Sequence, residues 1–153
     1  ACAELLLPRG AVITRMVRRG GAEEVLTAKS GPVLTSLPVV VLVNGETSSG
    51  AELLAAALQS NLRAQLVGQK TFGKWNVQTI EELPNGFACK FTISQFRAPG
   101  GQSYDGQGLT PDVEVSMDDK LLGRLSRVTD PDKRLAADIA LRTAANLARV
   151  QAR

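Results

Sequence analysis

The pattern of apolar and polar positions changes sharply within residues 39–68, and each segment predicts a different element. Residues 39–44 (VVVLVN) are apolar without alternation, which is typical of a strand buried on both faces. Residues 51–61 are rich in Ala and Leu and apolar nearly all round, which predicts a buried helix. Residues 64–68 (AQLVG) form another short β-prone run. Strand, helix and strand in this order predict a right-handed βαβ unit with parallel strands.

Alternating segments on both sides of this unit predict two β-hairpins. A turn at Gly20-Gly21 separates the first pair of strands, and a turn at Pro84-Asn85-Gly86 separates the second. The paired segments are residues 11–17 with 21–29, and residues 76–83 with 87–98. In the last of these segments apolar side chains recur at mostly alternating positions, namely Phe87, Cys89, Phe91, Ile93 and Phe96.

Shorter elements complete the predicted order. An apolar segment at 3–7 opens the chain, a connection spans 32–38, and a short strand is predicted at 112–115. Asp130 and Pro131 predict the start of a final helix that runs to about residue 150, with Asp130 as N-cap. The chain is therefore predicted to be α/β, with a mixed, largely parallel sheet flanked by helices and accompanied by β-hairpins.

Composition is consistent with a single domain over residues 1–153. With 44% hydrophobic but only 4% aromatic residues, its core is built mainly of aliphatic side chains. The net charge of +3 comes from scattered basic residues without an aromatic platform, which argues against a nucleic-acid partner. No apolar run reaches the ~18 residues of a membrane span, and no secretory signal is seen. The chain begins at Ala1 without Met, so we expect a processed chain or part of a longer protein.

Histidine is absent from the chain, and its absence narrows the chemistry. His-type zinc sites, Cys–His nucleophiles and Ser–His–Asp triads are all excluded. Cys2 and Cys89 lie far apart, form no metal-binding pattern, and give no support for a disulfide. We therefore expect neither a metal nor a cofactor.

Two adjacent serines, Ser48 and Ser49, stand where the first parallel strand meets the helix. Ser49 and Glu52 fit the S-x-x-E capping box, in which both side chains satisfy N–H groups of the first turn. The same position suits a nucleophile, because open α/β sheets place their ligands at the carboxyl ends of the strands. The helix N-terminus would stabilise an oxyanion there, with the Gly50 N–H as donor. On this segment alone both interpretations of Ser49 stay open.

A base for Ser49 has to be something other than histidine, and residues 68–78 (GQKTFGKWNVQ) offer Lys74. The segment first suggests a phosphate-binding P-loop, but Trp75 stands where that motif needs Ser or Thr, and a strand pattern follows. A lysine acts as a base when burial disfavours its ammonium form. The apolar neighbours of Lys74 favour such a setting, and Gln78 is placed to orient the lysine without adding a charge. The alternative is an ordinary exposed lysine in a loop.

The combined pattern resembles the C-terminal processing peptidases, also called tail-specific proteases. The resemblance rests on VVVLVNGETSSGAE and TFGKWNVQ, and it extends to GQSYDGQGLTPDVEV and the final DPDKRLAADIAL. It implies that Ser49 is the nucleophile, that Lys74, 25 residues later, is the base, and that Gln78 assists the lysine. It also implies a ClpP/crotonase-type core and an endopeptidase that cleaves near protein C-termini without a cofactor.

The resemblance carries further expectations and some departures. It implies substrates with exposed C-terminal tails and a periplasmic or otherwise extracytoplasmic location. Residues 1–153 resemble the C-terminal part of the family's catalytic domain, without its PDZ domain or its Asn-Pro-Gly-Gly loop. We therefore expect an exposed sheet edge and a homo-oligomer. Gly50 replaces a usual alanine, and Trp75 replaces a usual glycine, so its ring either crowds or desolvates Lys74.

Two other functions stay open at this point. One is a catalytically incompetent fragment or a peptide-binding or assembly module with the same fold. The other is a crotonase-like acyl-thioester enzyme, which shares the architecture but gains nothing from a serine paired with a lysine.

Overall fold

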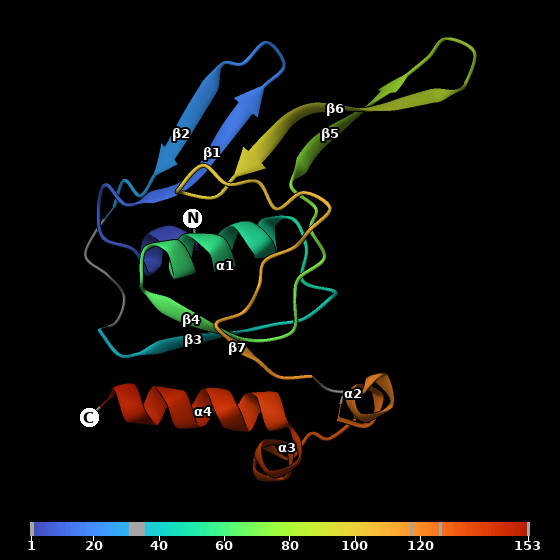
Figure 1. Cartoon of the computed structure of the whole chain (residues 1–153). Helices are drawn as coiled ribbons and strands as arrows, with labels where there is room; N and C mark the ends of the chain where they lie inside the picture. The colour runs from blue at the N-terminus through green and yellow to red at the C-terminus, as the bar shows by residue number, and fades with distance from the viewer. Residues whose placement is uncertain (1, 31–35, 117, 126, 153) are drawn as a thin grey trace.

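The chain folds into layers that stack a sheet on a helix on a second sheet on a further helix (Figure 1). The computed structural model describes residues 2–30, 36–116, 118–125 and 127–152. Most of the connection expected over 32–38 lies outside these described residues. A short 3-10 helix, η1 (Ala3–Leu5), opens the chain where an apolar segment was predicted.

The inner sheet is the predicted βαβ unit with one strand added. It contains β3 (Val39–Val43), β4 (Ala64–Gly68) and β7 (Val113–Glu114) in the order β3-β4-β7, and both pairings are parallel. The crossover between β3 and β4 is α1 (Gly50–Ser60), close to the predicted span. The carboxyl ends of β3 and β4 therefore lie at the same edge of the sheet. The turn that contains Ser49 follows β3, and the segment that contains Lys74 follows β4.

Helix α1 is the centre of the hydrophobic core. Its residues Ala55, Ala56, Ala57 and Leu58 are each 0–1% exposed, as expected for a helix that is apolar nearly all round. Both clusters of buried hydrophobic residues contain α1 side chains, so the helix packs on both of its sides. A run of alanines allows this because small side chains let the neighbouring layers approach closely.

The prediction that β3 is buried on both faces holds only in part, because α4 packs on this strand and Val41 and Val43 belong to the core around α1, but the burial is incomplete. In the described chain β3 pairs only with β4 and forms an edge of its sheet. Its side chains are mostly half-buried, and Leu42 is 44% exposed. A continuous apolar run indicates what a strand can pack against, whereas its actual neighbours depend on the rest of the fold. Exposed apolar edges of this kind invite pairing with another strand.

The outer sheet is antiparallel and combines both predicted hairpins in the order β2-β1-β6-β5. Its strands are β1 (Val12–Arg18), β2 (Glu23–Thr27), β5 (Asn76–Glu82) and β6 (Ala88–Arg97). The β5–β6 hairpin projects away from the body of the molecule (Figure 1). Its alternating apolar residues consequently find no core to pack on, and several remain exposed, namely Ile80, Leu83, Phe87, Phe91 and Ile93.

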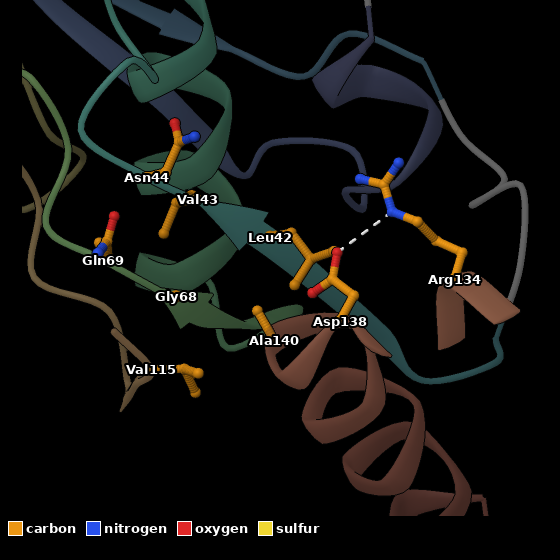
Figure 2. Close-up of a pocket in the computed structure, with 9 residues that line it drawn as sticks. All are labelled: Leu42, Val43, Asn44, Gly68, Gln69, Val115, Arg134, Asp138 and Ala140. Atoms are coloured by element: carbon orange, nitrogen blue, oxygen red, sulfur yellow. Dashed lines mark hydrogen bonds and ion pairs between the residues drawn. The ribbon is translucent and has the colours of Figure 1, made fainter. Parts of the chain in front are cut away.

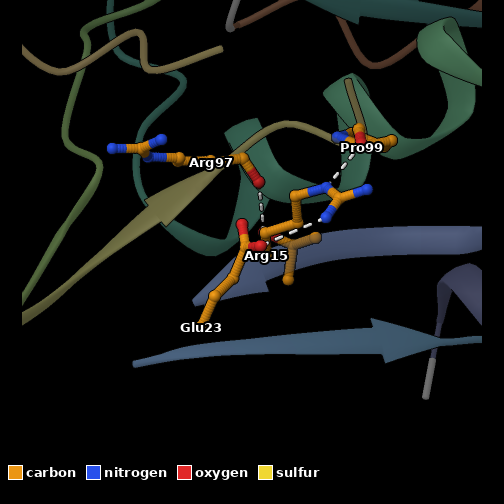
Figure 3. A network of polar contacts seen from close by, with 5 residues as sticks. Arg15, Glu23, Arg97 and Pro99 are labelled. Atoms are coloured by element: carbon orange, nitrogen blue, oxygen red, sulfur yellow. Dashed lines mark hydrogen bonds and ion pairs between the residues drawn. The ribbon is translucent and has the colours of Figure 1, made fainter. Parts of the chain in front are cut away.

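A polar network joins β1 to the carboxyl end of β6 (Figure 3). The Arg15 guanidinium donates from Nε to the Pro99 carbonyl at 2.9 Å and forms an ion pair with Glu23 at 3.3 Å. The neighbouring Thr14 hydroxyl donates to the Arg97 carbonyl at 2.7 Å. These bonds fix the register at which the second hairpin meets the first, and so the place of β5 next to the body.

The C-terminal region contains more helices than the sequence predicted. Helix α2 (Asp119–Leu125) was not anticipated, and the single helix expected after Asp130 is two helices, α3 (Pro131–Ala137) and α4 (Ile139–Gln151). Asp130 is the N-cap of α3, as predicted, and accepts from two first-turn N–H groups at 3.0 Å. The break falls at Asp138, whose extended backbone ends α3 and whose carboxylate accepts from Leu141 N–H at 3.0 Å to start α4.

Candidate active site

The turn between β3 and α1 is held by side chains of its own. The Asn44 carbonyl oxygen Oδ1 accepts from Glu46 N–H and Thr47 N–H, both at 3.1 Å, and the Thr47 hydroxyl oxygen accepts from Asn44 N–H at 3.0 Å. The Thr47 carbonyl in turn accepts from Phe72 N–H at 3.0 Å. An Asx-type turn of this kind closes the chain tightly and ties it to the segment that carries Lys74.

Ser49 has an unusual backbone conformation, with φ 56° and ψ −122°. A positive φ is rare for a residue with a side chain and costs on the order of 1–3 kcal/mol, so the surroundings must enforce it. Strained serines at strand-to-helix turns are typical of nucleophiles, because the sharp turn leaves the hydroxyl exposed at the edge of the sheet. Ser49 is exposed, whereas Ser48 is half-buried.

The carboxylate of Glu52 connects the serine turn to the lysine segment. Glu52 is 0% exposed and accepts four hydrogen bonds. Oε2 accepts from Ser49 N–H at 2.9 Å and from Lys74 N–H at 2.8 Å. Oε1 accepts from the Thr71 hydroxyl at 2.5 Å and from Gly73 N–H at 2.8 Å. One buried carboxylate thus fixes the backbones of Ser49 and Lys74 relative to each other.

The capping box predicted at Ser49 is therefore present, with a larger role than predicted. Glu52 reaches back to the Ser49 N–H, as the S-x-x-E pattern requires. The Ser49 side chain stands opposite the Glu52 N–H, but this contact falls short of a well-formed hydrogen bond. The sequence pattern identified the local half of the arrangement. The bonds from Thr71, Gly73 and Lys74 arise only from tertiary folding.

Two interlocked loops hold the lysine segment in place. The Thr71 N–H donates to the Leu109 carbonyl at 3.0 Å, and Leu109 N–H donates to the Thr71 hydroxyl at 2.7 Å. Gly73 and Gly108 both have a positive φ. A Cβ on Gly108 would lie 2.0 Å from the Thr71 carbonyl oxygen, and one on Gly73 would lie 2.7 Å from the Gly108 nitrogen. Only glycine allows the two backbones to approach this closely.

Trp75 is buried in the core, whereas the neighbouring Lys74 is exposed. The Trp75 side chain is 0% exposed and packs near Tyr104, with the two ring centroids 5.3 Å apart. Asp105 accepts from the Trp75 N–H at 3.0 Å and fixes this part of the backbone. Because successive side chains of an extended segment point to opposite sides, a buried Trp75 turns Lys74 outward. The desolvation of Lys74 expected from the Trp75 ring is thus not found in this structure.

The structure brings Ser49, Lys74 and Gln78 to one pocket of about 300 Å³. The remaining lining residues come from β5 and β6, namely Asn76, Val77, Ile80, Lys90 and Phe96. Lys74 and Gln78 are both exposed, so the apolar setting expected for the lysine is not found in this structure. The register of β5 against β6 shifts between Val77 and Gln78, an irregularity that is common beside active sites.

Gly50 occupies the first position of α1, next to this pocket. The first N–H groups of a helix have no partner inside the helix, so the Gly50 N–H is one of the donors that the helix leaves unused. In the described part of the chain, no atom beyond the adjacent residues and the backbone of α1 lies within 4 Å of a Cβ built on Gly50. The alanine that is usual at this position would therefore fit without displacing a neighbour.

A second pocket, of about 220 Å³, lies at the same sheet edge between the strands and helices α3 and α4 (Figure 2). Its floor is apolar, and its charged groups already pair with each other. Arg134 and Asp138 form an ion pair at 3.4 Å, and Arg134 also donates to the Leu125 carbonyl at 2.9 Å. Neither Ser49 nor Lys74 lines this pocket, so it offers no comparable chemistry.

Other kinds of site find no support in the described part of the chain. No cluster of three Cys, Asp or Glu side chains there is arranged to hold a metal ion. Cys2 and Cys89 are both exposed and unbridged. None of the described helices is long and apolar enough to cross a membrane.

The parallel βαβ unit and the packing around α1 define the class of fold, an α/β core of the ClpP-like type. Solved structures agree with this fold. The structure of a photosystem II D1 C-terminal processing protease superposes with a TM-score of 0.71 at 29% identity, covering 92% of this chain and 35% of that chain. A putative S41 protease from Bacteroides fragilis gives a TM-score of 0.72 at 18% identity, covering 97% of this chain and 40% of its own, and supports the fold alone.

Sequence comparison then identifies the family. The peptidase family S41 model matches residues 1–115, and the chain belongs to this family. A carboxyl-terminal-processing protease of Synechocystis sp. is 42% identical over 113 residues, which are 74% of this chain and 26% of that protein. One from Picosynechococcus sp. is 39% identical over 127 residues, 83% of this chain and 30% of that protein. The chain therefore spans only about a quarter to a third of the length of these relatives.

Proposed function

We propose that this chain is the catalytic core of a serine endopeptidase that cleaves proteins near their C-termini through a Ser49–Lys74 dyad. The observation that carries the proposal is the shared pocket of Ser49, Lys74 and Gln78, together with the Glu52 carboxylate that binds the backbones of both Ser49 and Lys74. Family membership supports the same reaction class.

The proposed reaction has two half-reactions. Ser49 Oγ attacks the carbonyl carbon of the peptide while its proton moves to Lys74 Nζ, and the Gly50 N–H donates to the resulting oxyanion. The C–N bond then breaks, Lys74 gives the proton to the leaving amine, and an acyl-enzyme remains on Ser49. Water next attacks the acyl-enzyme and gives a proton to Lys74, and the ester C–O bond then breaks as Lys74 returns that proton to Ser49 Oγ, which releases the carboxylic acid and regenerates both residues. No step calls for a metal ion or a cofactor.

Lys74 has to be uncharged when it accepts the serine proton. Its exposure to water opposes this, because water stabilises the charged form. An ammonium group in contact with water is strongly hydrated, and displacing that water favours the neutral amine. A bound peptide chain over the pocket would displace it. We therefore expect the dyad to become active when the substrate covers it.

Covalent labelling of the intact chain tests the dyad directly. A fluorophosphonate reacts with activated serines, and the site of the adduct is read by mass spectrometry. We expect an adduct on Ser49 in the wild type and in Ser48→Ala, but none in Ser49→Ala, Lys74→Ala or Lys74→Arg. Arginine keeps the charge of lysine and cannot act as a base, so Lys74→Arg separates base chemistry from electrostatics. An adduct that persists in Lys74→Arg would contradict the dyad.

A peptide-binding module is the second candidate function, and one observation favours it. Strand β5 is an edge strand in the described chain and borders the pocket, so its free backbone groups can pair with an extended peptide. Binding of an unstructured peptide without any adduct on Ser49 at any pH would favour this function over the protease.

The proposal also extends to the setting of the protein. Its substrates would be proteins with exposed C-terminal tails, its location extracytoplasmic, and its assembly state a homo-oligomer formed through the exposed edge of β3. Cell fractionation and the mass of the purified chain in solution test the last two.

A further inference from the structure

Asn76 carries an acceptor that the described structure leaves unused. Its side-chain oxygen Oδ1 is buried and has no hydrogen-bond partner in the part of the chain that is described. Buried polar atoms in native proteins are nearly always paired, so an unpaired one calls for an explanation. Asn76 lines the pocket that contains Ser49, Lys74 and Gln78. The unused acceptor thus belongs to a residue of the candidate active site.

Asp105 fixes which way the Asn76 amide is turned. Asn76 Nδ2 donates to Asp105 Oδ1 at 3.3 Å, and the same oxygen accepts from the Trp75 N–H at 3.0 Å. A carboxylate only accepts hydrogen bonds, so the NH₂ group of Asn76 must face Asp105. The carbonyl oxygen is then held on the other side of the amide plane. The contact with Asp105 therefore determines which end of the Asn76 amide is the oxygen.

The protonated base offers the matching donors. A lysine ammonium has three N–H donors and no acceptor. During the proposed reaction, which this inference presupposes, one donor faces Ser49 or the leaving amine and a second faces Gln78. A third remains. Lys74, Asn76 and Gln78 are each two residues apart, the spacing that puts side chains on one side of an extended chain.

We propose that Asn76 is a positioning residue whose Oδ1 accepts a hydrogen bond from the Lys74 ammonium while the lysine carries the serine proton. Because the Asn76 side chain is uncharged, it holds the Lys74 ammonium next to Ser49 without keeping the lysine in its charged form, as a carboxylate would. Asp105 acts behind it, since it holds the amide in the required orientation. The acceptor is left over in the free chain because it is used only when Lys74 turns toward it.

Several charged groups surround this contact. Glu52 from α1 binds the Lys74 backbone N–H, Lys90 from β6 lines the pocket, and Asp105 holds the Asn76 amide. Lys90 disfavours a second positive charge in the pocket, whereas Glu52 and Asp105 favour one. Their effects remain constant in variants that alter only Asn76, so such variants isolate its contribution.

Three variants of the intact chain test the inference. Asn76→Leu removes the amide, including its acceptor, but keeps the branched shape of the side chain, Asn76→Asp keeps an acceptor but adds a charge, and Thr79→Ala is a control on β5 outside the pocket. With labelled casein as substrate, we expect Asn76→Leu to lower kcat by about tenfold, the size of a lost hydrogen bond to a charged group, with KM unchanged. Asn76→Asp should retain more activity but move the pH–rate profile to higher pH. Thr79→Ala should match the wild type.

A second measurement does not depend on turnover. The ¹³Cε signal of Lys74, assigned with Lys74→Arg, reports the protonation of this lysine as pH is varied. We expect its transition to move to lower pH in Asn76→Leu and to higher pH in Asn76→Asp, relative to the wild type. Transitions that coincide in all three chains would overturn the inference.

The outcomes separate this inference from the proposed function. If Ser49 is labelled normally but Asn76→Leu matches the wild type in kcat and in the Lys74 transition, the inference fails and the dyad stands. If Asn76→Leu raises KM alone, Asn76 binds substrate and does not position the lysine, which also overturns it. If Ser49 is never labelled, the dyad fails, and this inference, which presupposes the dyad, fails with it.

Discussion

Replacing Glu52 with glutamine should destabilise the chain far more than one lost charge at a surface would. The carboxylate accepts from Thr71 and Gly73 at one oxygen and from Ser49 and Lys74 at the other, at 2.5–2.9 Å. A glutamine replaces one of these oxygens with an NH₂ group. Whichever way the amide turns, donors then face donors.

The two orientations of that glutamine have different costs. With the NH₂ group on the side of Ser49 and Lys74, two backbone N–H groups lose their acceptor. With the NH₂ group on the other side, the Thr71 hydroxyl can turn and accept, but the Gly73 N–H is left unpaired. A buried donor without a partner costs about 1–3 kcal/mol, and the remaining bonds lose their charge assistance. We expect Glu52→Gln to cost about 2–4 kcal/mol, and Glu52→Ala about 3–5 kcal/mol.

Urea unfolding followed by tryptophan fluorescence measures this effect. The chain has a single tryptophan, Trp75, which is buried and directly follows Lys74, so the signal reports the lysine segment itself. Glu46→Gln is the matched control because Glu46 is an exposed glutamate in the same turn. If Glu52→Gln unfolds within about 0.5 kcal/mol of Glu46→Gln, the assignment of four hydrogen bonds to Glu52 is wrong. Without urea, where the Glu52→Gln chain is still folded, fluorophosphonate labelling of Ser49 should also be lower than in the wild type.

Substitutions at four further positions test other parts of the site and fold. Gly108→Ala should cost about 3 kcal/mol or more in urea unfolding, because Gly108 has a positive φ and its Cβ would lie 2.0 Å from the Thr71 carbonyl oxygen. A smaller cost would show that the loops containing Thr71 and Gly108 are not interlocked. Trp75→Ala should lower the free energy of unfolding by about 3–5 kcal/mol. Trp75→Phe should lower it by only about 1 kcal/mol, because the buried indole N–H has no hydrogen-bond partner in the described structure to lose. Unfolding followed by circular dichroism measures both, and equal losses of stability would contradict this reasoning. Gly50→Ala should stabilise the chain by about 0.4–1 kcal/mol in thermal unfolding and leave Ser49 labelling intact, because its N–H is kept. Asp138→Ala should cost about 1–2 kcal/mol through the lost cap of α4, and an unchanged denaturation midpoint would argue against that cap.

The two pockets at the sheet edge illustrate why side-chain chemistry, and not cavity shape, identifies the site. The pocket beside α3 and α4 is bounded by an ion pair whose members already satisfy each other. The pocket beside Ser49 is lined by that exposed serine, by two lysines and by the amides of Asn76 and Gln78. The oxygen of the Asn76 amide has no partner in the described chain. Groups that still need a partner are the ones available to bind or transform another molecule.

The amino-acid sequence by itself determined those features that depend on near neighbours. The βαβ unit, the two hairpins and the N-cap at Asp130 were predicted because period, turn residues and capping patterns act over a few positions. Ser49 and Lys74 follow the two strands of the βαβ unit, and this order along the chain allows both to reach one edge, because parallel strands end on the same side. The break at Asp138 could have been suspected on the same local grounds, since an aspartate is a good N-cap.

Tertiary structure decided what each of these segments faces. Side chains of the apolar run of β3 remain half-buried at an edge of the sheet, and Lys74 is exposed although its neighbours in the sequence predicted an apolar setting. Glu52 looked like a cap and became the acceptor that joins two segments about twenty residues apart. Burial and hydrogen bonding between distant segments depend on which surfaces meet, and the loops that meet here are brought together by packing around α1. A local pattern contains no information about that distant partner.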